Sequence, residues 1–563
     1  MAETLISPGV LARENDLSQV TQQPITVGAA IVGPTVKGPV NIPTLVTSYS
    51  DYASKFGTSF VSGGDFYSYL TSIAAFNYFQ AGGETMLVTR VVAGTYTAAT
   101  ASISGSGSVT AFTLETLSKG TIMNSFSVEV SGTLPSGSTD NIRWEIATAN
   151  TGSGTFSLLI RRGDDNPNNK IILETWNNLS LDPKQPNYIS AVIGDQVQNF
   201  NSTNTQIETS GSYPNASRYV RVKSVSLPTP DYFDNTGTAK AAFVGNIPVI
   251  ASGSVAGASG SLIAGARFYD QISSANTQGL TAADYTNVIT LLGNKDDYQF
   301  NVLATPGIYR ADYSSITSLA ASECQDRGDA IYVADLVAYG AAQTAVITQA
   351  SAIDNSYAAA YWPWLQVSDP DTGKLVWVPA STLIPAVFAY NDRVGAEWFA
   401  PAGINRGGLG TVLRAERKLA SADRDTLYSA NINPIASFPN TGVVVYGQKT
   451  LQKKASATDR VNVRRLLINL KTYISQVSQT LVFEQNTTAT RNNFLAQVNP
   501  YLQSVQQRQG LYAFRVVMDD TNNTADVIDR NQLVGAIYIQ PTKTAEFIIL
   551  DFNILPTGAT FPA

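Results

Sequence analysis

The chain has 563 residues but no histidine, and its only cysteine is Cys324. Without histidine, neither a Ser-His-Asp nor a Cys-His nucleophile can be assembled. A single thiol forms no internal disulfide, and thiol and imidazole are the usual ligands of structural zinc. The sequence therefore predicts no catalytic residue and no metal ligand, and Cys324 is expected as a small residue on a helix.

Charged residues are also scarce, at 14% of the chain, and the net charge is −6. An acidic balance gives no reason to expect direct nucleic-acid binding. No apolar run reaches the roughly 18–20 residues of a membrane span, so no membrane insertion is expected. The opening MAETLISPGV lacks the basic and apolar regions of a secretion signal. With 44% hydrophobic residues and abundant Gly, Ser, Thr and Asn, the composition favours a packed, β-rich protein.

Phosphate-binding motifs are missing as well. The glycine-rich stretches SGSGS (104–108) and RGGLG (406–410) lack the strand-to-helix context that a phosphate cradle needs. DPDTGK (369–374) has too few carboxylates for an EF-hand loop and is typical of a hairpin turn. We therefore expect no bound cofactor and no enzyme activity. A hydrolase or dehydrogenase built on the α/β pattern of 236–430 remains the remote alternative.

The length predicts several domains, in an α+β multidomain chain. The expected core is an α/β domain built from both chain ends and the middle, and it carries an inserted β-rich sandwich or barrel. The expected segments are an extended arm (1–24), the first part of the core (25–96), the β-rich insertion (97–235), an α/β unit (236–430), a C-terminal unit (431–544) and a final strand and arm (545–563).

The first two of these units carry specific local predictions. In 25–96 we expect strands over 25–32 and 85–92 and helices over 50–56 and 65–80. In 97–235, short alternating runs predict strands. The cluster of Arg161, Arg162, Asp164 and Asp165 could indicate a catalytic pair, but a solvated turn is the preferred interpretation.

The α/β unit alternates helical and strand patterns, which predicts a sheet with parallel strands. Helices are expected over 281–293 and 314–327, and strands over 300–304 and 330–334. A hairpin is expected to join 364–367 to 375–378. The tryptophans of this unit are interpreted as core or interface anchors rather than as a ligand site. They are Trp362, Trp364, Trp377 and Trp398.

The C-terminal unit has the strongest periodicity. Apolar residues at helical spacing predict a long helix from about 459, with a second over 489–509 that ends at Gly510. Strands are expected over 511–518, 532–540 and 546–554. On the first helix, Arg460, Arg464 and Lys471 fall within about 40° of each other, beside the apolar face. This basic strip is either a solvated helix face or a contact surface.

The ends of the chain leave two interpretations open. The arm over 1–24 has too few apolar residues to fold alone, so it is either a frayed terminus or a segment that orders on the sheet edge of a partner. The last strand has one apolar face, made of Ile548, Leu550, Phe552 and Ile554.

Several ordered stretches resemble contractile phage tail sheath proteins. They are NPIASFPNTGVVVYGQKT (433–450), RVNVRRL (460–466), VFEQN (482–486), DDTNNTADVIDRN (519–531), AEWFAPAGINRGGL (396–409), SYAAAYWPWLQVSDPDTGKLVWVPAS (356–381) and, near the start, ISPGVLARE (6–14). The resemblance covers roughly two thirds of the chain and is weakest over 97–235. The middle of such proteins is described as subtilisin-like, and without histidine that term can refer only to shape.

The resemblance implies a structural subunit that polymerises helically around an inner tail tube and contracts during genome delivery. Implied partners are further copies of the chain, the tube protein, and baseplate and tail terminator proteins. The implied location is the virion tail, after assembly in the host cytoplasm. A headless contractile injection particle is the alternative.

The resemblance also assigns roles to the residues singled out above. Both ends become links between subunits, through Ile6, Val10 and Leu11 at the N-terminus and Ile548, Leu550, Phe552 and Ile554 at the C-terminus. The C-terminal unit becomes the part that faces the tube, through Arg460, Arg464 and Lys471.

Overall fold

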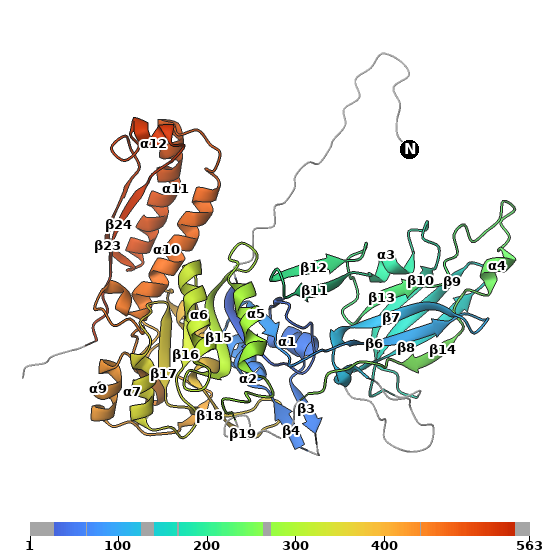
Figure 1. Ribbon diagram of the computed structural model, residues 1–563, viewed down its shortest axis with the longest axis horizontal. Helices are drawn as coiled ribbons and strands as arrows, with labels where there is room; N and C mark the ends of the chain where they lie inside the picture. Colours follow the sequence, from blue (N-terminus) through green and yellow to red (C-terminus); the bar gives the residue numbers. More distant parts are fainter. Residues whose placement is uncertain are drawn as a thin grey trace, which may run out of the picture.

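The computed structural model describes residues 27–62, 65–124, 140–165, 168–262, 272–439 and 441–546. These residues form a mixed α/β structure with several sheets (Figure 1). A large sheet with its helices lies in the middle, strands from the first half of the chain extend to one side, and a pair of long helices stands at the other. No helix of this described part is long and apolar enough to cross a membrane.

The central sheet has eight strands in the order β2-β5-β1-β15-β16-β17-β21-β22. The strands from β5 to β21 pair in parallel, while β2 and β22 add antiparallel at the edges. Two segments far apart in sequence therefore complete one sheet. Its strands are β1 (Val27–Gly33), β2 (Thr44–Val46), β5 (Met86–Arg90), β15 (Phe300–Tyr309), β16 (Ile331–Asp335), β17 (Ala358–Trp362), β21 (Asn433–Phe438) and β22 (Gly442–Val445).

Helices pack on this sheet, which explains why its strands β16 and β17 are buried along their whole length. The helix α5 lies beside α6, and α2 lies beside α8. Local signals set the ends of these helices: Thr281 and Asp284 form a capping box at the start of α5, and Gly328 ends α6 with φ of 74°. The helices are α1 (Tyr49–Phe56), α2 (Leu70–Gln80), α5 (Ala282–Leu292), α6 (Ser314–Arg327), α7 (Gln343–Ser351), α8 (Ile384–Val394) and α9 (Ser421–Ser429).

The expected helix over 65–80 is wrong in its first turn. Residues Asp65–Ser68 form β4, which pairs with β3 (Ser59–Ser62). Phe60 lies opposite Tyr67, and their rings stack with centroids 5.7 Å apart. Cross-strand aromatic pairs of this kind stabilise a hairpin. The pairing of these side chains therefore outweighs the weak helical pattern, and α2 begins only at Leu70.

Strands between 98 and 254 form further sheets around their own buried cluster of side chains. Because β14 pairs with β8, this β-rich part continues past the expected boundary at 235. Its strands are β6 (Ala98–Ser104), β7 (Thr110–Lys119), β8 (Ile142–Asn150), β9 (Thr155–Arg162), β10 (Ile172–Ser180), β11 (Val197–Asn201), β12 (Gln206–Ser210), β13 (Val220–Val225) and β14 (Ala251–Ser254). Its short helices are α3 (Ile189–Ile193) and α4 (Ala241–Val244).

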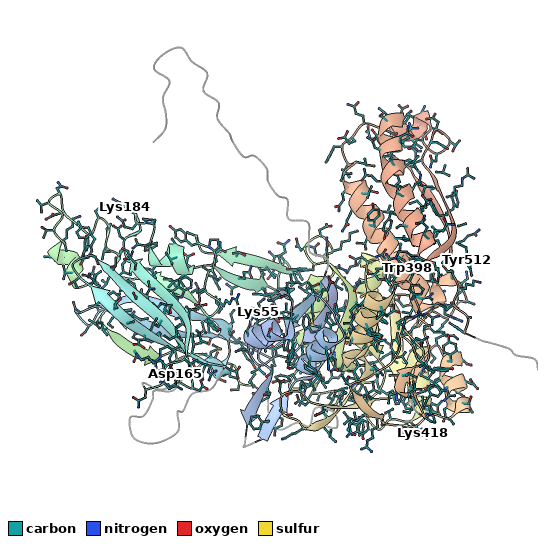
Figure 2. The ribbon with its side chains drawn as sticks, turned by 180° about the vertical axis from the view of Figure 1, so that it is seen from behind. Lys55, Asp165, Lys184, Trp398, Lys418 and Tyr512 are labelled. Atoms are coloured by element: carbon teal, nitrogen blue, oxygen red, sulfur yellow. The ribbon has the colours of Figure 1, made fainter. Side chains whose placement is uncertain are left out.

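The expected solvated turn around Arg161 is also wrong. Asp165 is 1% exposed and accepts a 2.6 Å hydrogen bond from Nε of Arg161, whose Nη1 donates to Glu145 at 2.7 Å. Only Arg162 and Asp164 form a pair that water reaches. Figure 2 shows Asp165 within the β-rich part. These charges hold the end of β9 in place and form no catalytic pair.

The hairpin expected from DPDTGK is confirmed. The strands β18 (Leu365–Ser368) and β19 (Leu375–Val378) pair antiparallel, and β20 (Val412–Ala415) adds on the other side of β18. The interpretation of the tryptophans as core residues is confirmed for Trp362, Trp364 and Trp398, each at most 8% exposed, whereas Trp377 is half-buried. Cys324 is buried in α6, as expected.

The C-terminal unit confirms the two long helices and two of the three strands. They are α10 (Val461–Gln479), α11 (Thr488–Gln507), β23 (Leu511–Val517) and β24 (Ala536–Pro541), with the short α12 (Ala525–Asp529) between the strands. Trp398 belongs to the same buried cluster as α10 and α11, and its Nε1 donates to the Arg508 carbonyl at 2.9 Å. Figure 2 places Trp398 and Tyr512 where this unit meets the main body.

Candidate assembly site

The sequence points to assembly surfaces rather than to metal ligands or a reactive thiol. Within the ranges described above, no three His, Cys, Asp or Glu residues come together as metal ligands. The thiol of Cys324 is fully buried, and burial raises its pKa. A thiol held neutral in this way is a poor nucleophile. The predicted functional surfaces are those of the C-terminal unit.

The two predicted arms lie outside the described residues. This holds for Ile6, Val10 and Leu11 at the N-terminus and for Ile548, Leu550, Phe552 and Ile554 at the C-terminus. The described chain starts at 27, where β1 enters the middle of the central sheet, and stops at Glu546. The surroundings of Glu546 are therefore the closest view of the C-terminal arm.

Glu546 is held by side chains from three separate elements. Its Oε1 accepts hydrogen bonds from Nε of Arg460 at 2.7 Å and from Nε2 of Gln448 at 3.0 Å. Its Oε2 accepts one from the hydroxyl of Tyr428 at 2.7 Å. Tyr428 lies on α9, Gln448 follows β22, and Arg460 immediately precedes α10. We call these four residues the Glu546 clamp.

The electrostatics of the clamp favour an ionised carboxylate. Burial acts to raise the pKa of Glu546, but hydrogen bonds from Tyr428, Gln448 and Arg460 outweigh it and hold the pKa below its usual range. Burial raises the pKa of Tyr428, and its hydrogen bond to the carboxylate adds to that shift. The clamp therefore joins a carboxylate, a neutral phenol and a guanidinium, and it fixes the point from which the C-terminal arm leaves.

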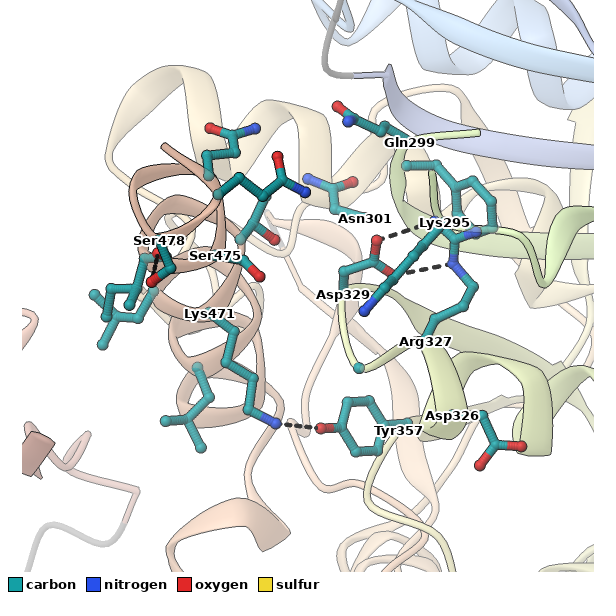
Figure 3. A pocket seen from close by; sticks show the side chains of 18 of the residues that line it. Lys295, Gln299, Asn301, Asp326, Arg327, Asp329, Tyr357, Lys471, Ser475 and Ser478 are labelled. Carbon is teal, nitrogen blue, oxygen red and sulfur yellow. Dashed lines mark hydrogen bonds and ion pairs between the residues drawn. The ribbon is translucent and has the colours of Figure 1, made fainter. Parts of the chain in front are cut away.

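The predicted basic strip is not an exposed surface of three cations. Arg464 is 6% exposed, stacks its guanidinium 4.0 Å from the ring centroid of Tyr357, and donates from Nη2 to Ser356 Oγ at 2.6 Å. Lys471 is exposed, but its Nζ donates to the hydroxyl of Tyr357 at 2.9 Å (Figure 3). Arg460 belongs to the clamp. Arg464 and Lys471 therefore turn toward Tyr357, just before β17, whereas Arg460 turns toward Glu546.

A groove runs beside Lys471, between α10 with β24 on one side and the region from α5 to β16 on the other (Figure 3). Its volume is about 1060 Å³. On its far wall, Arg327 donates from Nε and Nη2 to the two carboxylate oxygens of Asp329, at 2.9 and 3.0 Å. The same guanidinium also donates to the carbonyls of Leu292 and Tyr298. The hydrogen bonds of this wall are thus largely satisfied within the chain.

The hairpin of β23 and β24 is the most open part of the sheet structure. These strands pair only with each other among the described residues. Phe514, Val516, Ile537 and Ile539 pack toward the helices, whereas Tyr512 and Tyr538 are 62% and 63% exposed on the other face. Both outer edges can therefore accept a further strand, because each carries backbone N–H and C=O groups without a ladder partner.

Sequence reasoning found α10 and its polar face but missed the Glu546 clamp. Tyr428 and Glu546 lie 118 residues apart, and neither belongs to a periodic pattern. One signal was available: Glu546 is the acidic first residue of the predicted strand 546–554, directly before the apolar run 547–550. A charge at that position indicates an anchor point.

Comparison with known proteins finds two domains of one protein family in this chain. Residues 278–451 match the family described as phage tail sheath protein central domain, and residues 453–555 match the phage tail sheath C-terminal domain. The first match covers the α/β unit from α5 to β22, and the second covers α10, α11 and the hairpin.

Two tail sheath proteins are similar in sequence. That of Vibrio phage KVP40 is 42% identical over 216 residues, which are 38% of this chain and 31% of that protein. That of Enterobacteria phage T4 is 42% identical over 185 residues, which are 33% of this chain and 28% of that protein. The matched part is therefore less than a third of the length of these relatives.

One solved structure shares the fold over nearly the whole chain. The sheath tail protein Lin1278 of Listeria innocua aligns with 92% of this chain and 95% of its own, with a TM-score of 0.53 and 11% identity. At that identity the likeness concerns the fold alone. The two domain matches and the similar sequences lead to one conclusion. By its central and C-terminal domains, the chain belongs to the phage tail sheath proteins.

Proposed function

We propose that this chain is the structural subunit of a contractile tail sheath, which polymerises helically around an inner tail tube and contracts to drive that tube through a host envelope. Membership of the sheath family supports this proposal. A subunit that joins the next one through unlike surfaces, by a rotation that does not close, builds an open helical filament. The expected location is the virion tail, with assembly in the host cytoplasm.

The observation that carries the proposal is the open hairpin β23–β24 beside the root of the C-terminal arm. Among the described residues, these two strands pack one face on the helices and have no partner strand at either edge, so they form an incomplete sheet. Extended segments from neighbouring subunits would complete it by adding strands on either side. The predicted arms, 1–24 and 545–563, are the segments of this chain suited to that role.

Strand addition of this kind gives links of modest strength. Ordering about ten residues costs roughly 10–20 kcal/mol of backbone entropy. Backbone hydrogen bonds return about 1 kcal/mol each, so apolar side chains must supply much of the remainder, at about 1.5–3 kcal/mol each. The lattice would then be stable because it contains many such links. Main-chain links also persist while rigid units rotate, which contraction requires.

A role without enzyme activity fits the same proposal. Contraction would draw its energy from an extended lattice that relaxes to a better-packed one, so no nucleotide site is needed. The partners of this role are further copies of the chain, the tube protein and the proteins at the two ends of the tail. A headless injection particle would use the same fold, and capsid and terminase genes beside this one would distinguish a phage from it.

The arm deletion is the direct experiment. Removing residues 1–20 should leave a folded subunit that stays small in sedimentation and forms no tubes in electron microscopy. A matched control replaces the same residues by a Gly/Ser segment of equal length, which keeps the chain length but removes Val10 and Leu11. Both variants should fail to polymerise. Tubes of normal length from either variant would contradict the proposed role of the arm.

The C-terminal arm is tested by Ile548→Asp combined with Leu550→Asp. Two carboxylates on the apolar face should weaken assembly, because they cannot be buried against a neighbouring sheet. Circular dichroism and the melting temperature of the soluble subunit separate an assembly defect from a folding defect. Wild-type assembly by this variant would show that its apolar face does not join subunits.

A further inference from the structure

Exposed apolar side chains gather at the end of the C-terminal unit that lies away from the main body. Phe483, in the connection between α10 and α11, is 103% exposed, so its ring is fully in solvent. Val482 beside it is exposed, and so are Ile528 and Val534 in the connection between β23 and β24. Figure 1 shows α12, which contains Ile528, at the top of this unit. We call these four residues the apolar tip. Exposed apolar patches mark interaction sites.

Hydrogen bonds hold the apolar tip in a fixed shape. Asn486 donates from Nδ2 to the Gln532 carbonyl at 2.8 Å, which joins the segment before α11 to the segment before β24. Arg491 donates from Nε to Asn486 Oδ1 at 2.9 Å and from Nη1 to Asp520 at 2.5 Å. The two connections are therefore locked together. A preformed surface loses less conformational entropy when a partner binds it.

The backbone holds Phe483 in a strained conformation. Its φ is 70°, in the left-handed region, and the turn is closed by a hydrogen bond from the Glu484 N–H to the Leu481 carbonyl at 3.1 Å. Glycine or asparagine is favoured at the third position of a turn with positive φ. A bulky residue is unfavourable there. Because the ring of Phe483 is also in water, the folding of one copy does not explain it, whereas a contact formed on assembly does.

Carboxylates surround the apolar tip. The connection between β23 and β24 contains four aspartates and one cation, which are Asp519, Asp520, Asp526, Asp529 and Arg530. Arg530 pairs with Asp526, and Asp529 is exposed. A complementary partner surface is therefore basic, and it also has an apolar or aromatic part that receives Phe483.

A surface of this kind lies on the main body of the same chain, from β20 to the start of α9. Three arginines there stack on aromatic rings, with 5.3–5.7 Å between Cζ and the ring centroid: Arg414 on Trp377, Arg417 on Trp362, and Arg424 on Phe438 and Tyr446. Lys418 is exposed, and the ring of Tyr446 is half-exposed. We call Arg414, Arg417, Lys418, Arg424 and Tyr446 the arginine face. Arginine and tyrosine are enriched among the residues that dominate binding energy at interfaces.

The carboxylates of the same stretch leave this face basic. The side chain of Glu416 is 7% exposed, and Asp423 caps α9 by accepting from the Ala420 N–H at 3.0 Å, so Asp425 is the acidic residue that is exposed there. Each arginine also donates within the chain: Arg414 to Gln366, Arg417 to the Gly340 carbonyl and Arg424 to the Leu419 carbonyl. Stacking fixes the guanidinium planes, and the further N–H groups of each plane suit carboxylates.

The apolar tip and the arginine face lie too far apart to meet within one copy. Figure 1 places α12 at the top of the C-terminal unit and α9 at the bottom of the main body, and Figure 2 shows Lys418 at that lower end. A surface and its complement at separate places on one chain give a contact between unlike surfaces. Such a contact repeats from copy to copy and builds an open filament when its rotation does not close.

We propose that the apolar tip of one copy docks on the arginine face of another, with Phe483 against Tyr446 and the aspartates of the tip against the cations of the face. This inference rests on the proposed helical assembly. It adds a contact between two folded surfaces to the links that the arms make. The contact joins a C-terminal unit to the main body of another copy, and it weakens as salt screens its charges.

Phe483→Asn tests the apolar part of this contact. Asparagine tolerates a positive φ, so the variant should melt at the same or a higher temperature than the wild type. Assembly should nevertheless weaken, with at least a tenfold rise in the protein concentration at which tubes appear in sedimentation and electron microscopy. Tubes at the wild-type concentration would overturn the proposal and leave the tip to another partner, such as the tube protein. A wild type that forms no tubes would instead contradict the proposed assembly itself.

A charge exchange tests the polar part. Asp526→Lys combined with Asp529→Lys makes the tip basic, and Arg414→Glu combined with Lys418→Glu makes the face acidic. Each pair of substitutions should suppress tube formation, because like charges then meet. All four substitutions in one chain should restore tubes, since every contact is again between opposite charges. Failure of the fourfold variant to restore tubes, although circular dichroism shows it folded, would overturn the proposal.

The matched control changes net charge without touching the face. Arg218→Glu and Lys454→Glu, at exposed positions elsewhere, are added to the tip variant in place of the two face substitutions. This chain has the same net charge as the fourfold variant and should form no tubes. Equal restoration by the control would show that net charge governs assembly, and the specific contact would be rejected.

Crosslinking keeps the proposal testable if a charge variant does not fold. Cys324 is buried, so thiols introduced at exposed positions react selectively. Gln532→Cys at the tip and Ala422→Cys at the start of α9 leave the contact residues in place. Tubes of the double variant, treated with a short bismaleimide, should give a ladder of covalent oligomers on a denaturing gel, and neither single variant should. Tubes that give no ladder would contradict the contact.

Discussion

Arg460 and Glu546, 86 residues apart, share a 2.7 Å hydrogen bond that ties the start of α10 to the end of the described chain. The side chains are 26% and 17% exposed, so the pair is largely shielded from water. Glu546 is the second residue of the predicted C-terminal arm, 545–563. The pair therefore anchors the start of that arm, and it occupies Arg460, which the family resemblance assigned to the tube surface.

Glu546→Gln should loosen the root of the arm without unfolding the unit. The amide keeps the size of the side chain but loses the charge that Arg460 and Tyr428 recognise, at a cost of about 1.5–3 kcal/mol. Hydrogen exchange followed by mass spectrometry should show faster exchange over 542–546 and unchanged protection of α10 and α11. Polymerisation should weaken because Arg460 and Tyr428 no longer hold the start of the arm. Glu484→Gln, at an exposed position, is the matched control.

The same pair predicts a pH effect. The folded-state pKa of Glu546 lies below its ordinary value, so the clamp contributes stability above the unfolded-state pKa of about 4.3. That contribution is lost as the pH falls through the lower folded-state pKa. The protection of 542–546, taken relative to intrinsic exchange at each pH, should therefore fall on acidification in the wild type toward the value seen in Glu546→Gln. A constant difference between the two proteins at all pH values would contradict this assignment.

Arg464→Glu should destabilise the C-terminal unit rather than act at a tube surface. The substitution loses a stacking contact on Tyr357, worth about 2 kcal/mol when desolvated, and a charged hydrogen bond to Ser356. Urea unfolding should show a loss of roughly 2–4 kcal/mol. Lys471→Glu, at the exposed end of the same strip, should cost less than about 1 kcal/mol.

The same two variants also test the tube contact. Because Lys471 is the exposed cation of the strip, Lys471→Glu should reduce sheath growth on tubes, and more so at low salt. If sheath growth of Lys471→Glu is unchanged at all salt concentrations, the basic strip does not contact the tube. Arg464→Glu cannot serve for this purpose, because any loss of growth would follow from the loss of folding.

The elements that were predicted correctly are those whose signal is local. The period of α10, the Gly510 that follows α11 and the turn between β18 and β19 are each a signal within a few residues, and each element was placed within a few residues of its observed bounds. Burial of charge was not predictable in this way. Arg464 is buried because Tyr357, 107 residues earlier in the chain, packs against it. The helical periodicity of α10 gives the direction of the Arg464 side chain but does not show which residues lie there.

The same distinction between local patterns and long-range contacts applies to the candidate site. The apolar face of the last strand and the basic strip were visible in the sequence, because each repeats at a fixed period. The Glu546 clamp depends on segments that meet only in the folded chain. Buried polar groups select partners by geometry and not by spacing, so they are the residues that sequence reasoning misses first.

Asp165→Asn should destabilise the β-rich part by about 3 kcal/mol. Arg161 would keep Glu145 as a partner but would lose the buried carboxylate at 2.6 Å, and removing one member of a buried pair leaves its charge uncompensated. Asp164→Asn is the matched control one residue earlier. It breaks a partly exposed pair and should cost less than about 1 kcal/mol. Hydrogen exchange of peptides from 142–180 measures both, and equal effects would contradict the buried network.

Asp335 gives the last prediction, which concerns alkaline pH. This carboxyl ends β16, has only hydrogen bonds from the backbone and hydroxyl of Ser381, and burial raises its pKa to about 7. The folded protein therefore holds a proton on Asp335 between about pH 4 and 7, where the unfolded chain has lost it. Stability from this group falls as the pH rises through that window. Asp335→Asn, which mimics the neutral form, should reduce the loss of melting temperature between pH 5 and pH 8. The exposed control Asp296→Asn should not. If wild type and Asp335→Asn lose stability in parallel over this range, Asp335 does not titrate there.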